Sequence, residues 1–94
     1  MNMRFEWDEH KNEENLRKHK INFADVPAIF AAPMLVRLDD RKEYGEERWV
    51  GIGYLSVTVA VVVWVERRDD VTRIISARKA NRKERERYER FLSH

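Results

Sequence analysis

Two segments near the beginning of the chain have the apolar spacing of helices. Asp8 is a suitable N-cap for a helix that continues to about residue 18, in which Leu16 is among the few apolar positions. A second helical segment is expected to begin at Asn22 or Phe23. Its apolar positions recur at intervals of three and four residues: Phe23, Val26, Ile29 and Phe30. Pro33 then ends this segment, so the pattern predicts two consecutive short helices.

Most of the remaining chain is built from short apolar stretches that are typical of strands. A short opening strand is expected around Phe5 and Trp7. Further strands are expected at residues 34–38, 48–54, 56–66 and 71–79. The polar segment 39–47 is expected to form a loop, and residues 67–70 a turn. The stretch 56–66 is apolar on both faces, which predicts a strand in the middle of a sheet.

Glycines and a capping motif complete the predicted architecture. Gly51 and Gly53 lie on one face of their strand, where another part of the chain is expected to approach closely. Asn81 with Glu84 three residues later predicts a capping box that begins a final helix. The order of elements predicts an α+β fold, an antiparallel β-sheet meander with two N-terminal helices and a C-terminal helix. We expect one sheet face to carry the helices and the other to be free for function.

The composition limits the chain to one domain and excludes several kinds of chemistry. Ninety-four residues, 43% of them hydrophobic, suffice for a single domain over residues 1–94 with one core. The absence of cysteine excludes disulfides, thiolate catalysis and cysteine-bound zinc. The longest apolar run, residues 57–65, is far shorter than the roughly 20 residues that cross a membrane. Because no signal-peptide pattern follows the first residues, we expect a cytoplasmic protein without membrane contact.

Positive charge is concentrated at the C-terminal end, although the net charge of the chain is only +2. Residues 1–20 balance five basic against five acidic side chains, and residues 21–70 carry a net charge of −3. Residues 71–94 hold eight basic and three acidic side chains, which gives a net charge of +5. This asymmetry favours a polyanion such as nucleic acid, or an acidic protein, as the partner.

Four segments of the sequence stand out as possible family motifs. They are Phe-Glu-Trp-Asp (5–8), Asn-Leu-Arg-Lys-His (15–19), Glu-Glu-Arg-Trp (46–49) and Arg-Ile-Ile-Ser-Ala-Arg-Lys-Ala (73–80). They resemble the segments that mark the BrnT family of toxin–antitoxin ribonucleases, and the last is the most specific. Their order and spacing also match, over nearly the whole chain. The resemblance implies a RelE-like fold and ribosome-independent RNA cleavage without a cofactor. It further implies inhibition by a BrnA-type antitoxin with a ribbon-helix-helix part, in a complex that binds its own promoter DNA.

Arginine is the residue type best suited to the cationic part of metal-independent RNA cleavage. A guanidinium can contact two phosphate oxygens at once and stabilise the charge that develops on the phosphorane. Arg78, near the end of the last strand, and Arg48, at the start of another, are the first choices for catalysis. Strict alternation places on one face of the last strand Thr72, Ile74, Ser76 and Arg78, and on the other Arg73, Ile75, Ala77 and Lys79. The alternative role for Arg78 is a structural salt bridge to Glu46, Glu47 or Glu66.

Proton transfer requires a base for the ribose 2′-OH and an acid for the leaving 5′-oxygen. His19 suits these roles because histidine changes its charge near neutral pH, but a histidine at a helix end often only satisfies the last carbonyls. Lys20 could bind phosphate, and it stands where members of the BrnT family usually have glycine. Glu66, at the end of the central strand, and Glu47 are the carboxylate choices, with a structural ion pair as the alternative for Glu66. The residues alone do not select among these candidates.

Other residues are expected to hold the RNA rather than to react with it. Arg67, Arg73 and Lys79 supply positive charge, and Tyr54 is the best candidate for stacking on an unpaired base. No metal site is expected, because the three histidines lack the paired spacing of metal ligands. The sequence therefore favours a ribonuclease toxin that holds and cleaves single-stranded RNA on an arginine-lined sheet face. A non-catalytic nucleic-acid-binding or regulatory protein is the main alternative, and a module that only sequesters a partner is a third.

Overall fold

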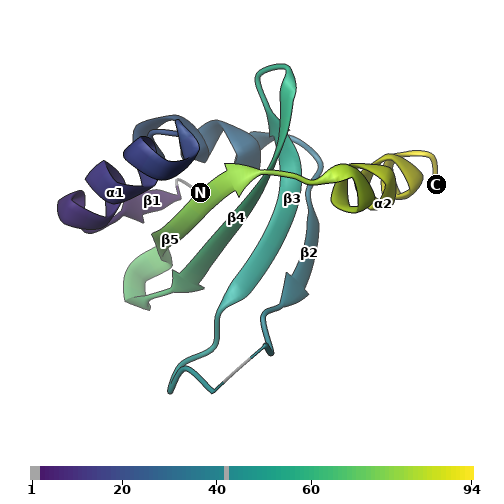
Figure 1. The fold of residues 1–94 in the computed structure, drawn as a ribbon. Coiled ribbons are helices and arrows are strands. Elements are labelled where there is room, and N and C mark those ends of the chain that lie inside the picture. Colours follow the sequence, from purple (N-terminus) through teal and green to yellow (C-terminus); the bar gives the residue numbers. More distant parts are fainter. Residues whose placement is uncertain (1–2, 42) are drawn as a thin grey trace.

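The computed structural model of the chain describes residues 3–41 and 43–94. Its centre is a sheet of five strands in the order β1-β5-β4-β3-β2 (Figure 1). The strands are β1 (Arg4–Glu6), β2 (Leu35–Leu38), β3 (Trp49–Leu55), β4 (Thr58–Glu66) and β5 (Val71–Lys79). Strands β2 to β5 pair antiparallel in chain order, and the valine-rich strand β4 lies in the middle, as predicted.

The predicted antiparallel meander is confirmed for β2 to β5, but the opening strand joins it in parallel and makes the sheet mixed. Strand β1 pairs with β5 in parallel, with Phe5 opposite Thr72. The antiparallel prediction applies to strands that follow one another along the chain and are joined by turns or short loops. Strands β1 and β5 are far apart in the sequence, so no turn fixes their relative direction.

Three helices accompany the sheet: α1 (Glu9–His19), the 3₁₀ helix η1 (Phe23–Ala31) and α2 (Arg82–Leu92). A short 3₁₀ turn, η2 (Arg68–Asp70), lies between β4 and β5. Asp8 and Asn22 cap the first two helices through their side chains, and Asn81 with Glu84 forms the predicted capping box. Helix η1 holds Pro27, which has no N–H to donate to a helical bond. None of the described helices is long and apolar enough to span a lipid bilayer.

Both faces of the sheet carry a cluster of buried apolar residues, and different helices pack on them. Helices α1 and η1 cover one face, the α1 face, whose core is Ile21, Phe23, Val26, Ile29, Ala60, Val62, Trp64, Ile74 and Ala77. Helix α2 packs Tyr88 onto the opposite α2 face, where the buried neighbours are Val50, Ile52, Val59, Val61, Val63 and Ala80. The expectation that one face carries all helices is therefore wrong. Because β4 is apolar on both sides, each side needs a cover.

Gly51 and Gly53 lie on the α1 face where the packing leaves no room for a side chain, as predicted. A Cβ atom on Gly51 would lie 2.5 Å from the sulfur of Met34 and 2.8 Å from the ring of Trp64. A Cβ atom on Gly53 would lie 2.9 Å from a methyl group of Ile29. The glycines therefore allow η1 and the residues after it to approach the sheet closely.

A β-bulge interrupts the alternation of β5. The register shifts between Val63 and Trp64 of β4, so Ile75 has no counterpart on that strand. Ile74 is buried in the α1-face core, whereas Ile75 packs on the α2 face. The predicted grouping of Ile74 with Arg78 is wrong, because the extra residue shifts the side-chain period by one.

Asn15 of α1 makes a hydrogen bond to the part of β5 that the short strand β1 does not reach. The buried Asn15 side chain accepts a hydrogen bond from the backbone N–H of Ala77 at 3.1 Å. It also donates to the carbonyl of Ile21 at 3.0 Å. A side-chain amide thus takes the place of a neighbouring strand and holds α1 against the end of β5 that carries Arg78.

Candidate active site

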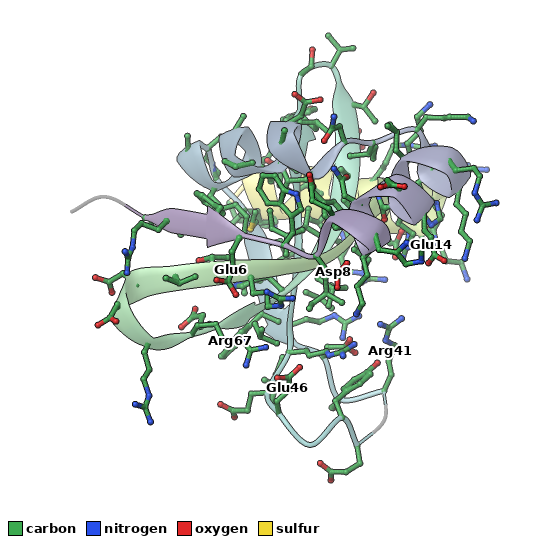
Figure 2. The ribbon with its side chains drawn as sticks, turned by 90° about the vertical axis from the view of Figure 1, so that its left-hand side faces the viewer. Glu6, Asp8, Glu14, Arg41, Glu46 and Arg67 are labelled. Atoms are coloured by element: carbon green, nitrogen blue, oxygen red, sulfur yellow. The ribbon has the colours of Figure 1, made fainter. Side chains whose placement is uncertain are left out.

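Arginine side chains from several segments gather on the part of the α2 face that α2 leaves open. The strand register places Arg37, Arg73 and Arg78 beside valines of neighbouring strands. Figure 2 shows Arg41 and Arg67 on the side of the sheet opposite to α1, which carries Glu14. We call this surface the arginine face: Arg37, Arg41, Arg48, Arg67, Arg73 and Arg78.

Glu84 of α2 holds the guanidinium of Arg78. The two terminal nitrogens of Arg78 donate 2.8 Å hydrogen bonds to the two carboxylate oxygens. The same carboxylate accepts the backbone N–H of Asn81 in the capping box. Arg78, followed by this backbone bond, lowers the pKa of Glu84 from 4.5 to about 2, and the pairing also raises the pKa of Arg78. The sequence analysis gave a structural salt bridge to Glu46, Glu47 or Glu66 as the alternative role of Arg78. Arg78 does form a salt bridge, but its partner is Glu84.

A cleft of about 70 Å³ opens beside this pair, on the arginine face. Arg37, Arg41 and Arg78 line it together with Ser76 and Glu84. Its floor is apolar and consists of Val50, Val61 and Val63. Several guanidinium groups around an apolar floor provide the charge and the donor geometry that a phosphate group requires.

Arg37 and Arg41 were not singled out by sequence reasoning. Arg41 lies in a polar loop, where arginines are usually only solvated. Its guanidinium instead makes hydrogen bonds of 2.8 and 2.9 Å to the buried carboxylate of Asp39, which lower the pKa of that carboxyl. The sequence signal that could have identified Arg41 is its spacing from Asp39, because a carboxylate two residues away can orient a loop arginine.

Arg48 and Arg67, both predicted from the sequence, approach the same carboxylate. The Arg67 guanidinium lies 3.4 Å from one oxygen of Glu46, and the Nε atom of Arg48 lies 3.7 Å from the other. The guanidinium of Arg48 also lies 4.1 Å from the ring centre of Tyr44, a cation–π contact. Arg73 is paired separately, at 2.8 Å, with Glu6 of β1. Arg67, Arg73 and Arg78 are thus each contacted by a carboxylate from another segment, whereas Arg48 is contacted by residues of its own loop.

The other predicted residues lie outside the arginine face. His19 and Lys20 lie at the C-terminal end of α1, and Lys20 has a left-handed backbone with φ of 62°. The register directs Glu66 and Lys79 toward the α1 side of their strands. Glu66 also lines an open cleft at the end of β4. Tyr54 is exposed on the α2 face, where its ring packs edge-on against α2.

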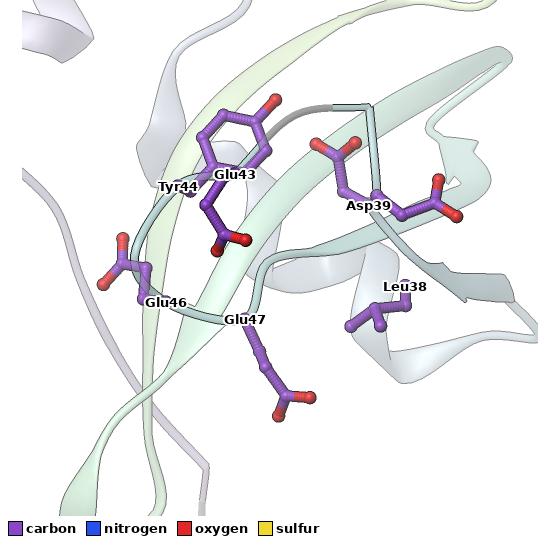
Figure 3. A pocket seen from close by; sticks show the side chains of 7 residues that line it. Leu38, Asp39, Glu43, Tyr44, Glu46 and Glu47 are labelled. Carbon is purple, nitrogen blue, oxygen red and sulfur yellow. The ribbon is translucent and has the colours of Figure 1, made fainter.

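Carboxylates line a separate cleft formed by the loop between β2 and β3. The acidic residues of this cleft are Asp39, Asp40, Glu43, Glu46 and Glu47. Figure 3 shows their side chains spread around the loop rather than converging on one point. Within residues 3–41 and 43–94, no group of three His, Asp or Glu side chains is placed to hold a metal ion.

Comparisons with known proteins agree with the fold. The family model of BrnT, the ribonuclease toxin of type II toxin–antitoxin systems, matches residues 7–84. The crystal structure of the Brucella abortus ribonuclease toxin BrnT is similar in fold, with a TM-score of 0.67 and 24% sequence identity. That match covers 86% of this chain and 100% of the Brucella chain. No curated protein sequence matches the chain. The extent of the family match shows that this chain belongs to the BrnT family of ribonuclease toxins of type II toxin–antitoxin systems.

Proposed function

We propose that the chain cleaves RNA without a metal ion, by attack of a ribose 2′-OH on the adjacent phosphorus. The observation that supports this proposal best is the arginine face, on which guanidinium groups surround a small cleft with an apolar floor. In this route the attacking oxygen belongs to the RNA, so the protein supplies orientation, positive charge and proton transfer. We also assign the sheet and its helices to the RelE-like fold that the family resemblance implies.

Arg78 and Arg48 are the cations that we assign to the reacting phosphate. Glu84 orients the first of them through two hydrogen bonds, and Tyr44 and Glu46 contact the second. Such oriented charges need little rearrangement when negative charge builds up on the phosphorane, which is the main source of electrostatic catalysis.

Among the residues singled out from the sequence, the candidates for proton transfer are His19, Lys20 and Glu66. The position of Glu66 favours a role in proton transfer, because Glu66 lines a cleft together with Arg67. His19 and Lys20, at the end of α1, would reach RNA that passes around the edge of β5. Arg67, Arg73 and Lys79 would contact neighbouring phosphates, and Tyr54 would stack on an unpaired base.

We further propose that a BrnA-type ribbon-helix-helix antitoxin silences the toxin by covering the arginine face. Membership of a toxin–antitoxin family implies an antitoxin, and a surface with six arginines suits an acidic protein segment as well as RNA. The complex of the two proteins would then bind its own promoter DNA through the antitoxin.

The decisive experiment is cleavage of end-labelled single-stranded RNA by the purified protein in EDTA. The proposed route gives 2′,3′-cyclic phosphate and 5′-hydroxyl ends, which mass spectrometry distinguishes from other termini. A strict need for Mg²⁺, or products with 5′-phosphate ends, would contradict the mechanism. RNA that is bound but left intact would favour the non-catalytic alternative.

A further inference from the structure

Glu46 occupies a distinct position among the carboxylates of the arginine face. It precedes β3, and its two oxygens face arginines from two different segments, Arg67 at 3.4 Å and Arg48 at 3.7 Å. Figure 2 shows Glu46 and Arg67 on the same side of the sheet. The Glu46 side chain is about one-third exposed, 33%, so RNA can reach it.

The other carboxylates on this face are held by short hydrogen bonds. Both oxygens of Glu84 accept 2.8 Å bonds from Arg78, and Asp39 is bound in the same way by Arg41. Glu6 accepts a 2.8 Å bond from its own arginine partner. The contacts of Glu46 with its arginines are longer than a direct hydrogen bond, which leaves lone pairs that can accept a proton from a substrate.

Glu46 also lines an open cleft of about 360 Å³ at the ends of β3 and β4. Arg67, Trp49 and Val65 contribute to the same cleft, together with the carboxylates of Glu47 and Glu66. Of the three carboxylates in this cleft, Glu46 is the one paired with two arginines. This volume lies in the range of small-ligand sites and suits one nucleotide of a single strand. A reacting phosphate at Arg48, with a neighbouring phosphate at Arg67, would bring the ribose close to the Glu46 carboxylate.

We infer that Glu46 is the base that accepts the proton of the 2′-OH, an inference that rests on the proposed function. The 2′-oxygen forms a bond to phosphorus as its proton passes to a Glu46 oxygen. The bond from phosphorus to the 5′-oxygen breaks, and that oxygen takes a proton from water. Glu46 then returns its proton to solvent, so that no net proton, electron or co-reactant is consumed. Arg48 and Arg67 hold Glu46 in place. Arg48 also stabilises the charge on the phosphorane.

The test compares Glu46→Gln with Glu43→Gln, a carboxylate of the same loop that contacts no arginine of the face. Loss of a general base should lower kcat of Glu46→Gln by about 10²- to 10⁴-fold and leave KM nearly unchanged. The parent and Glu43→Gln are expected to lose kcat toward low pH, and Glu46→Gln is expected to lack this fall. Circular dichroism establishes that both variants are folded.

Chemical rescue supplies a second, independent readout. Formate added to Glu46→Ala should restore cleavage in proportion to its concentration, and formate should not accelerate the parent. A Glu46→Gln protein that keeps parental kcat, or that keeps the low-pH fall at reduced kcat without formate rescue in Glu46→Ala, would overturn the inference. Failure of the parent itself to give cyclic phosphate ends would instead refute the proposed function.

Discussion

Arg78 of β5 donates two parallel 2.8 Å hydrogen bonds to the carboxylate of Glu84, the third residue of α2. The pair joins the part of β5 after the bulge to the helix that packs on the α2 face. Because Glu84 is also part of the capping box, the start of α2 and the orientation of the Arg78 guanidinium depend on each other. A site residue is thereby coupled to the docking of the C-terminal helix.

Substitution of Arg78 should affect both catalysis and stability. We expect Arg78→Ala to lower kcat by about 10²- to 10³-fold, as loss of one preorganised donor does, and Arg78→Lys to recover little because it lacks the two-point geometry. Arg82→Ala, an exposed arginine of α2 paired with Glu86, is the matched control. RNA cleavage is measured with the folded fraction from circular dichroism. A well-folded Arg78→Ala protein that cleaves at the parental rate would remove this residue from the site.

Glu84→Gln should destabilise the protein at neutral pH but not at very low pH. The pKa of Glu84 is lowered in the folded state, so its stabilisation is complete above the ordinary value of 4.5 and is lost as the pH falls toward about 2. After allowance for the 39% exposure of Arg78, the loss should be about 1–2 kcal/mol at pH 7. Urea unfolding of both proteins from pH 7 to pH 2.5 measures the difference. If the difference in unfolding free energy between the two proteins does not shrink on acidification, the stabilisation by Glu84 does not come from its charge.

Lys20→Gly should stabilise the fold. Lys20 ends α1 with a left-handed backbone, φ of 62°, and its N–H donates to the carbonyl of Leu16. Glycine adopts this conformation without a Cβ clash, so we expect a gain of about 0.5–1 kcal/mol in unfolding free energy. Thermal unfolding measures the gain, and cleavage of RNA by the same protein shows whether the Lys20 ammonium contributes to activity. A lower melting temperature of Lys20→Gly would show that contacts of the lysine side chain outweigh the cost of its left-handed backbone.

Asn15→Ala should be among the most destabilising single changes in α1. The substitution leaves the N–H of Ala77 and the carbonyl of Ile21 without their partner inside the protein. Two unsatisfied buried groups cost about 2–4 kcal/mol. Exposed Glu13→Ala in the same helix should change stability by less than about 0.5 kcal/mol. Faster hydrogen exchange of the Ala77 amide would localise the effect, whereas equal stability of the two variants would contradict it.

The antitoxin should compete directly with RNA. Equimolar BrnA-type antitoxin should abolish cleavage and protect the arginine face, which hydrogen exchange can map. Charge reversal by Arg73→Glu and Arg67→Glu should weaken antitoxin binding, because both arginines belong to the arginine face. Full ribonuclease activity in a stable complex would show that the antitoxin binds elsewhere.

Local signals in the sequence predicted the elements and several of their details. Asp8 and Asn81 cap their helices as expected, and Gly51 and Gly53 lie where η1 and Met34 approach the sheet. The valine-rich β4 is the central strand. These features depend on residues a few positions apart, whose capping, spacing and size act within one element.

Only the tertiary structure decided how these elements share the two faces of the sheet. The parallel pairing of β1, the position of α2 and the bulge at Ile75 depend on contacts between segments far apart in the sequence. The bulge shifted the side-chain period, and α2 brought Glu84 rather than a nearby glutamate to Arg78. Charged side chains carry no signal of which distant partner they meet, because long flexible chains pair through geometry that the whole fold sets. The placement of Glu46 between Arg48 and Arg67 follows from that geometry, since a loop and two separate strand ends must meet to create it.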